Sequence, residues 1–248
     1  MIELNDLLHR MEIEEGWNQE KFYQLLLRLS NHGSPGTWLD LGCGRGPKSP
    51  ELMAMTRELI GRRPIVGLDV DARGLRRRAD ILRVQASAEA MPFADGCFVL
   101  VSANMVVEHV EEPSALFREA RRVLDEKGIL IVHTSSARHY MLSIGGILSR
   151  LLSRRAYVRL AAVFSGREPD DIFPTRYRAN SALALRRGIE EAGFTVRLVF
   201  LETPLAFSSW RGRVERRVRH LLPPSMKSTL LAVCEKRRSF GEGAPEDG

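Results

Sequence analysis

The fold of this chain is decided by one stretch of sequence, Trp38-Leu39-Asp40-Leu41-Gly42-Cys43-Gly44-Arg45-Gly46-Pro47. Thr37 to Leu41 is mostly apolar, and its length suits a buried strand rather than a helix. Three glycines at alternate positions then allow positive φ angles and let a ligand approach the backbone. Pro47 suits the first turn of a helix, where the N–H that proline lacks would have no partner. The stretch predicts a strand, a turn and a helix N-terminus at the ligand-binding edge of an open α/β sheet.

Two other nucleotide-binding motifs share this shape, and both are excluded by the residues around the glycines. The dinucleotide fingerprint requires a small residue at the position of Pro47. The phosphate loop requires a lysine directly after its last glycine, whereas Pro47 separates Gly46 from Lys48. What remains is the pattern Asp-x-Gly-x-Gly-x-Gly between Asp40 and Gly46.

Length, charge and cysteine content indicate an ordinary globular chain. The 248 residues suit a single α/β domain, expected over 1–240 and followed by a disordered tail over 241–248. The net charge of +6 favours either an anionic partner or a solvated basic face. Three widely spaced cysteines argue against a disulfide framework or a metal site and favour a reducing, cytoplasmic compartment. Neither a signal peptide nor an apolar run of the ~18 residues that span a membrane is visible.

Hydrophobic periodicity predicts two helices followed by alternating strands and helices. Helices are expected over 3–14, 17–30, 47–60, 72–78, 113–124 and 182–192. Strands are expected over 37–41, 65–70, 81–86, 98–103, 128–133, 194–202 and 228–235. Strands separated by helices imply a parallel sheet with right-handed crossovers, and the last two strands suit an antiparallel edge. The predicted fold is a doubly wound, seven-stranded, mostly parallel α/β sheet.

Three segments outside this alternation are candidates to touch a ligand or a partner. The N-terminal helices within 1–33 either pack on the sheet or cover the ligand site. The insertion over 135–180 is expected to form a helical lid over the substrate. Within 205–222, apolar residues share one face of a basic helix, which would either lie on an anionic membrane surface or dock on the sheet.

An acidic residue ends the second predicted strand, Ile65-Val66-Gly67-Leu68-Asp69-Val70. A strand that ends in Asp about twenty residues after a glycine turn is the arrangement that binds two ribose hydroxyls. A carboxylate suits this task because each oxygen can accept one O–H. Asp71 is expected to cap the next helix, so Asp69 is the candidate ribose ligand.

Three more motifs follow in order, Gln85-Ala86-Ser87-Ala88-Glu89-Ala90-Met91-Pro92-Phe93, Phe98-Val99-Leu100-Val101-Ser102-Ala103-Asn104-Met105-Val106-Val107-Glu108-His109 and Arg122-Val123-Leu124-Asp125-Glu126-Lys127-Gly128-Ile129-Leu130-Ile131-Val132. With the two motifs above, the stretch from about Thr37 to Val132 resembles the class I (Rossmann-like) S-adenosylmethionine-dependent methyltransferases. Within that class it is most similar to the small-molecule type related to the quinone-biosynthesis C-methyltransferases. The resemblance implies the strand order 3-2-1-4-5-7-6 for the sheet. It also implies S-adenosylmethionine as cofactor and S-adenosylhomocysteine as product.

The resemblance also implies roles at the edge of the sheet. The glycine turn and Asp40 would shape the pocket for the methionine part of the cofactor. Asp69 would hold the ribose, Val70 would lie against the adenine, and Asn104 would lie near the sulfonium and the incoming substrate. Cys43 fits the turn as a small residue. The expected cofactor-binding residues are Asp40, Gly42, Cys43, Gly44, Gly46, Asp69, Val70, Ser87, Ala88 and Asn104.

Two residues depart from the pattern of the family. Ser87, which with Ala88 would border the adenine edge, stands where the family usually has Asp, so the contact to the adenine amino group would be weaker or made by backbone. Val99 stands where the family prefers Asp at the start of a strand, and little functional loss is expected there.

Methyl transfer from a sulfonium requires alignment of the nucleophile, and a general base only if the nucleophile must lose a proton. His109 is the first candidate base because it follows the fourth strand, with Glu108 as its candidate partner. The alternatives are a histidine bonded to backbone at a helix start and a glutamate that faces solvent. His133, His139 and Tyr140 follow the fifth strand and are second candidates.

The function expected from these residues is methyl transfer to a small-molecule or lipid- or saccharide-linked acceptor, at oxygen. The first alternative is a non-catalytic relative that keeps the fold and acts as a binding or assembly subunit. The second is an RNA methyltransferase, which only the basic surplus suggests. The sequence does not decide the acceptor, the oligomeric state or membrane contact.

Overall fold

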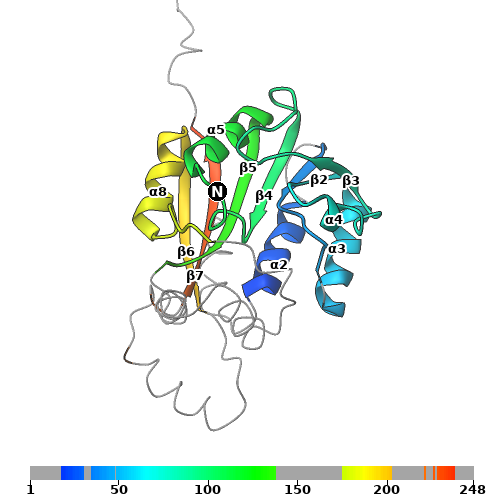
Figure 1. The fold of residues 1–248 in the computed structure, drawn as a ribbon, viewed down its shortest axis with the longest axis horizontal. Helices are drawn as coiled ribbons and strands as arrows, with labels where there is room; N and C mark the ends of the chain where they lie inside the picture. The colour runs from blue at the N-terminus through cyan, green and yellow to red at the C-terminus, as the bar shows by residue number, and fades with distance from the viewer. Residues whose placement is uncertain are drawn as a thin grey trace, which may run out of the picture.

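The computed structural model describes residues 18–30, 35–47, 49–137, 175–202, 221, 226 and 228–237. These residues form one seven-stranded sheet with helices packed against it (Figure 1). The strands are β1 (Trp38–Leu41), β2 (Ile65–Asp69), β3 (Leu82–Gln85), β4 (Phe98–Asn104), β5 (Leu124–Ser135), β6 (Phe194–Glu202) and β7 (Ser228–Lys236). The described helices are α2 (Asn18–Ser30), α3 (Pro50–Arg62), α4 (Ala72–Leu75), α5 (Pro113–Val123) and α8 (Ala182–Glu191).

The strand order is β3-β2-β1-β4-β5-β7-β6, which confirms the predicted topology. β1 to β5 pair in parallel, and β7 runs antiparallel to both β5 and β6. Because parallel strands end at the same side of a sheet, the loops that follow β1 to β5 meet there. We call this side the carboxyl edge. Open α/β sheets bind their ligands at such an edge.

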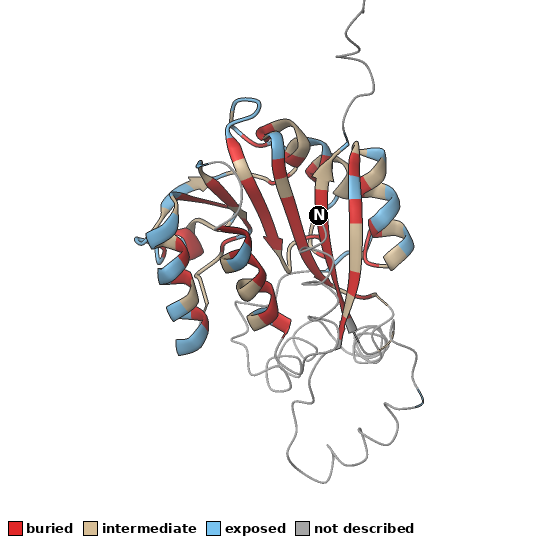
Figure 2. Ribbon diagram, turned by 180° about the vertical axis from the view of Figure 1, so that it is seen from behind, coloured by how far each residue is buried: buried red, intermediate tan, exposed pale blue. Residues whose placement is uncertain are grey.

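Two apolar clusters, one on each face, hold the helices on the sheet (Figure 2). Alternate residues of β1 contribute to the two clusters, Leu39 to one and Trp38 to the other, as the pleat of a strand requires. Phe117 of α5 and Ile189 of α8 belong to the Leu39 cluster. Phe22 of α2 belongs to the Trp38 cluster, so this helix packs on the sheet. Packing on the sheet was one of the two alternatives that the sequence left open for the N-terminal helices.

Helix α3 begins three residues later than predicted. Its first residue is Pro50 rather than Pro47, because Ser49 is the N-cap and its Oγ accepts a hydrogen bond from the backbone N–H of Leu52 at 3.2 Å. The cap, and not the earlier proline, therefore sets the start of the helix.

Two further boundaries differ. Helix α4 ends at Leu75 instead of near residue 78, and the chain continues in turns closed by bonds from Arg77 to Gly74 and from Arg78 to Leu75. Strand β5 begins at Leu124, directly after α5, and an irregularity in its pairing with β4 accommodates the added residues.

The two ends of the predicted lid are close together. Ala137, two residues after β5, donates its N–H to the carbonyl of Asn180 at 2.7 Å. The residues between them are mostly outside the described part, as are the basic segment over 205–222 except Leu221, the helix over 3–14 and the tail over 241–248. None of the described helices has the length and apolar character needed to cross a membrane.

Candidate functional site

The loop after β1 is a turn with three glycines in the left-handed region. The φ angles are +62° at Gly42, +50° at Gly44 and +79° at Gly46, which residues with a Cβ adopt only at a cost. Gly42 donates its N–H to the carbonyl of Leu68 at 2.7 Å, which extends the pairing of β1 with β2 into the turn. A Cβ on Gly42 would lie 2.4 Å from Cγ2 of Val106, so the missing side chain lets the loop after β4 approach.

The carboxylate of Asp69 joins the ends of β1 and β2. Its Oδ2 accepts the backbone N–H of Gly44 at 2.8 Å, and its Oδ1 accepts the N–H of Asp71 at 2.8 Å. Each oxygen keeps a lone pair for a ligand, since an ionised carboxylate has about four acceptor positions. Asp71 caps α4 through the N–H groups of Arg73 and Gly74, as predicted. The carboxylate of Asp69 is thus held in one orientation at the carboxyl edge.

Asp40 lies beneath the turn in a buried polar chain. Ser102 of β4 donates its hydroxyl to Oδ1 of Asp40 at 2.8 Å and accepts the indole N–H of Trp38 at 2.8 Å. Burial raises the pKa of Asp40 to about 6, although the nearby Arg78 and the bond from Ser102 act against the rise. A carboxyl group in this state gains stability from a cation placed beside it.

Arg78 supports the turn from below and was not anticipated from the sequence. It is only 4% exposed, pairs with Asp80 at 3.0 Å and donates to the carbonyl of Cys43 at 3.2 Å. A Cβ on Gly46 would lie 2.9 Å from its Cδ. No sequence signal distinguishes this arginine from its exposed neighbours, because it is buried by contact with the glycine turn, which lies 35 residues earlier in the chain.

The side chain of Cys43 points away from the ligand side of the turn. Its Sγ packs against Gly67 and would lie only 2.6 Å from a Cβ built on that glycine. Burial raises the pKa of the thiol to about 12. The backbone groups of Cys43 bond to Leu68 and Gly46. Cys43 therefore contributes to the shape of the turn, as its interpretation as a small fitting residue predicts.

Three predicted adenine contacts lie beside Asp69. Val70 is 63% exposed, an unusual exposure for a valine at the end of a buried strand. Ser87 accepts the N–H of Glu89 at 3.1 Å, so its hydroxyl closes its own turn. The side chain of Ala88 is buried in the core, so only its backbone borders the edge.

Asn104 is the last residue of β4, in the middle of the carboxyl edge. Its Oδ1 lies 2.8 Å from Nδ1 of His133 on β5. The next residue, Met105, has φ +58° and donates its N–H to the carbonyl of His133 at 2.8 Å. A left-handed conformation at a residue other than glycine is uncommon and frequently marks a functional loop.

The two predicted catalytic residues lie in a turn between β4 and α5, in different environments. Glu108 is 2% exposed, and its carboxylate accepts the hydroxyl of Thr134 at 2.7 Å. Thr134 in turn accepts the side-chain amide of Asn180 at 2.6 Å. Glu108 thus joins three segments of the chain and does not face solvent, so the solvent-facing alternative was wrong. His109 is partly exposed, and its backbone N–H donates to Val106 at 2.9 Å.

Of the second candidates, His133 is buried behind Asn104, and His139 and Tyr140 lie outside the described residues. Within the described part, no group of three or more His, Cys, Asp or Glu side chains has the arrangement of a metal site.

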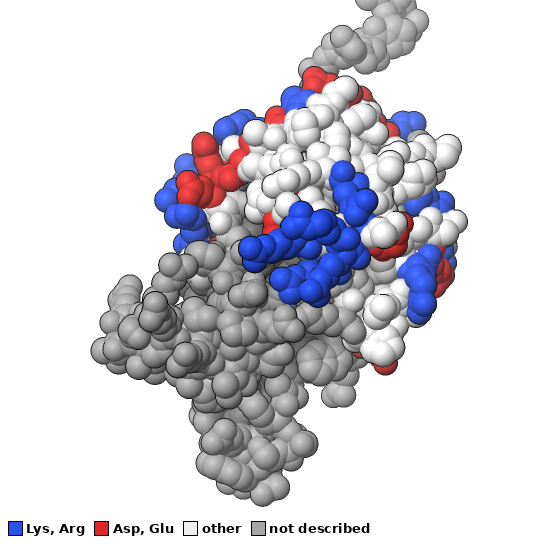
Figure 3. Space-filling model, turned by 45° about the vertical axis from the view of Figure 1, so that its right-hand side comes forward, with Lys and Arg blue, Asp and Glu red and all other residues white. Residues whose placement is uncertain are grey.

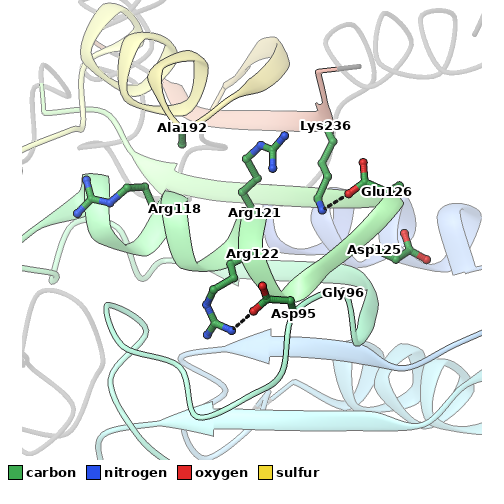
Figure 4. Close-up of a pocket in the computed structure, with 9 residues that line it drawn as sticks. All are labelled: Asp95, Gly96, Arg118, Arg121, Arg122, Asp125, Glu126, Ala192 and Lys236. Atoms are coloured by element: carbon green, nitrogen blue, oxygen red, sulfur yellow. Dashed lines mark hydrogen bonds and ion pairs between the residues drawn. The ribbon is translucent and has the colours of Figure 1, made fainter. Parts of the chain in front are cut away.

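A pocket on the opposite side of the sheet is lined mostly by charged side chains (Figure 4). It lies at the amino ends of β4 and β5, far from the glycine turn in the fold. Arg122 pairs with Asp95 at 2.8 Å, and Lys236 pairs with Glu126 at 3.0 Å. These two ion pairs engage two of the four basic side chains of the lining.

Four exposed arginines lie in α4, in the turn that follows α4 and in β3, all close in sequence to the Asp69 loop. Figure 3 shows basic side chains gathered on one face of the molecule. None of the four arginines forms an ion pair with a carboxylate of the described residues. The four are Arg73, Arg76, Arg77 and Arg83. The described part of the chain therefore carries a positive surface close to the candidate site, a location that the sequence did not indicate.

The central region of the chain is similar to known methyltransferases. Residues 39–132 match a family model described as "Methyltransferase domain". The chain is 36% identical over 110 residues to a malonyl-[acyl-carrier protein] O-methyltransferase of Legionella pneumophila, covering 41% of this chain and 37% of that protein. It is 34% identical over 113 residues to a ubiquinone biosynthesis O-methyltransferase of Azorhizobium caulinodans, covering 44% of each. The chain thus spans less than half the length of these curated relatives.

Among solved structures, the fold is similar to that of a geranyl diphosphate C-methyltransferase from Streptomyces coelicolor. The TM-score is 0.55 at 16% sequence identity, over 88% of this chain and 77% of that one. At this identity the likeness concerns the fold alone. It confirms the doubly wound architecture expected from the resemblance.

Proposed function

We propose that this chain, which carries a class I methyltransferase domain, transfers a methyl group from S-adenosylmethionine to a small-molecule or lipid- or saccharide-linked acceptor, at oxygen. The proposal is carried by one observation, the contact of the Gly44 N–H with the Asp69 carboxylate beside the exposed Val70. This contact lies within residues 39–132, the part that matches the methyltransferase family.

The residues present fit the cofactor. A Cβ built on Gly44 would have no neighbour closer than 3.9 Å, so the turn leaves open space where a ligand can lie. Asp69 offers acceptor positions for two ribose hydroxyls, and Val70 offers an apolar surface for a base. The ammonium group of the methionine part would stabilise the ionised form of Asp40, whose burial otherwise opposes ionisation.

The contribution of this chain to the reaction is mainly alignment and exclusion of water. When bound, S-adenosylmethionine supplies a methyl carbon that its sulfonium already activates. The turn, Asp69 and Asn104 hold their ligands from three neighbouring strands, and positioning of this kind can be worth ~7–11 kcal/mol. The described ends of the 135–180 insertion meet beside the carboxyl edge, which suits a cover over the acceptor.

An oxygen acceptor must lose a proton, for which we propose His109 as general base, worth about 10²–10⁴-fold in rate. Glu108 is not proposed as the base itself, because its buried carboxylate accepts a hydrogen bond from Thr134. Glu108 would instead fix the turn that carries His109.

The acceptor at oxygen is favoured by the names of both curated relatives, which are O-methyltransferases. The unpaired arginines beside the site favour an acceptor that carries negative charge.

The test compares two carboxylates of the same loop by calorimetry with S-adenosylmethionine. Asp69→Ala and Asp71→Ala each remove one negative charge and two bonds from backbone N–H groups. Only Asp69 is assigned to the ligand. We expect wild type and Asp71→Ala to bind, and Asp69→Ala to bind at least about tenfold more weakly, since hydrogen bonds to charged groups are worth about 1.5–3 kcal/mol.

Absence of binding to the wild-type chain would overturn the proposal and favour the alternative of a fold without catalysis. Binding followed by formation of S-adenosylhomocysteine with a defined acceptor would identify the acceptor class. Equal weakening by both substitutions would remove Asp69 as the ribose ligand.

A further inference from the structure

A series of hydrogen-bonded polar side chains runs from helix α2 through the sheet to the carboxyl edge. Asn18 donates from Nδ2 to Oγ1 of Thr229 at 2.9 Å. Thr229 lies 2.8 Å from Nε2 of His133, and Nδ1 of His133 lies 2.8 Å from Oδ1 of Asn104. This hydrogen-bonded series links the start of α2, β7, β5 and the end of β4.

The direction of the first bonds is fixed by a backbone carbonyl. Nδ2 of Asn18 also donates to the carbonyl of Leu201 at 3.2 Å. Because a carbonyl oxygen can only accept, the atom that faces it must be the amide nitrogen. The same nitrogen faces Thr229, so the hydroxyl oxygen of Thr229 accepts this bond.

The hydroxyl proton of Thr229 must then point at His133. Within the described residues, Nε2 of His133 is the one acceptor that bonds with this hydroxyl. An Nε2 that accepts a hydrogen bond carries no proton, so a neutral imidazole carries its proton on Nδ1. Nδ1 therefore donates to Asn104, which must present its oxygen and not its nitrogen.

The surroundings of His133 keep its ring neutral and fixed. The side chain is 1% exposed and stacks on Phe22 of α2, with ring centroids 5.7 Å apart and planes 28° from parallel. Burial lowers the pKa of His133 to about 4. Near neutral pH the ring thus stays in a single tautomer.

We propose that His133 is a positioning residue that fixes the side-chain amide of Asn104, so that the Nδ2 of Asn104 is presented as a hydrogen-bond donor at the carboxyl edge. Nδ2 of Asn104 bonds with none of the described residues, while Oδ1 is held by His133. The ligand group it would take is a hydrogen-bond acceptor, such as a carboxylate of the cofactor or an oxygen of the methyl acceptor. That assignment of the ligand rests on the proposed function.

The orientation can be tested without any ligand. In protein labelled with ¹⁵N at histidine, the ring nitrogens of His133 distinguish the two neutral tautomers by their chemical shifts. We expect the Nδ1–H tautomer between pH 6 and 8, and its loss or mixing in Thr229→Val, where Nε2 no longer receives a proton. An Nε2–H tautomer in the wild type would overturn the proposal.

The effect on ligand binding is tested with two matched substitutions of His133. His133→Asn places an amide near the former Nδ1 and can still donate to Asn104. His133→Gln places its amide near the former Nε2, so it reaches Thr229 instead. Both replace the same buried ring, so a purely structural role predicts equal effects. We expect S-adenosylmethionine to bind His133→Asn within about threefold of wild type and His133→Gln at least about tenfold more weakly.

Equal weakening of the two variants, in line with their loss of thermal stability, would contradict the positioning role. If the wild type bound no cofactor, the proposed function would fail, whereas the tautomer of His133 would still decide the orientation of Asn104. The two failures are therefore distinguishable.

Discussion

Alanine at Gly44 should separate the stability of the glycine turn from its ability to bind. Gly44 has φ +50°, and a Cβ there would meet nothing closer than 3.9 Å. The substitution therefore causes no clash, and its cost is the left-handed conformation, about 1–2 kcal/mol. For a domain of this size we expect the melting temperature to fall by about 2–8 °C. Binding of S-adenosylmethionine should fall at least about tenfold, because the new methyl group occupies the space of the ligand.

Two other glycines serve as controls for Gly44→Ala. Gly61 is an exposed residue of helix α3 with no atom within 4 Å of its Cβ position, so Gly61→Ala should stabilise the chain by about 0.8–1 kcal/mol and leave binding unchanged. A Cβ on Gly42 would lie 2.4 Å from Val106, so Gly42→Ala should destabilise more than Gly44→Ala, through a clash that costs about 1–3 kcal/mol in addition.

Melting temperatures by calorimetry and cofactor affinities of the three variants provide the measurement. Unchanged affinity in Gly44→Ala would refute the assignment of the open space to the ligand. A loss of stability in Gly44→Ala as large as in Gly42→Ala would refute the conformational reasoning.

Four further predictions follow from the site. Ser102→Ala should destabilise the chain by about 2 kcal/mol, because Trp38 and Asp40 lose a buried partner, and should raise the pKa of Asp40 further, which chemical denaturation and an NMR titration would measure. The folded pKa of His133, about 4, lies below the unfolded value of 6.5, so its contribution to stability grows by about 3 kcal/mol as pH rises through this interval, and denaturation against pH should lose this rise in His133→Asn. With a pKa of about 6 in the folded chain, about half of the Asp40 carboxyl groups are protonated at pH 6. Because the ammonium group of the cofactor should favour the ionised form, binding at pH 6 should release about half a proton, which appears as a dependence of the calorimetric heat on buffer ionisation. His109→Gln should lower kcat by about 10²-fold or more with an unchanged cofactor Kd, and full activity in this variant would exclude His109 as the base.

The sequence predicted the parts of the molecule whose signals are local. The glycines, Asp69 at the end of β2 and Asp71 as a cap are each defined within a few residues. The alternation of elements indicates a parallel sheet, and the order of its strands was implied by the family resemblance. The start of α3 was wrong because the cap Ser49 competes with Pro47, two short-range signals of similar strength. Boundaries depend on such competition more than the existence of elements does.

The sequence could not predict contacts between distant segments. The burial of Arg78 depends on the turn 35 residues earlier, whose Cys43 carbonyl it binds. The role of Glu108 depends on Thr134, 26 residues later, and the role of His133 depends on Thr229, 96 residues later. Each of these side chains is polar and would be expected at the surface. Their burial is possible only because a remote partner satisfies them.

This division between local and remote contacts also separates the two halves of the carboxyl edge. The cofactor half is held by bonds among neighbouring strand and turn units, such as Gly44 with Asp69 and Gly42 with Leu68. These units lie within 39–132, the range that the methyltransferase family shares. The half around Asn104 is instead held by β7, by α2 and by the residues near Asn180, all outside that range. The supports of this second half lie beyond the matched region, so the family match does not account for them. If Asn104 contacts the acceptor as proposed, the acceptor of this chain is best sought through Asn104 and its remote partners.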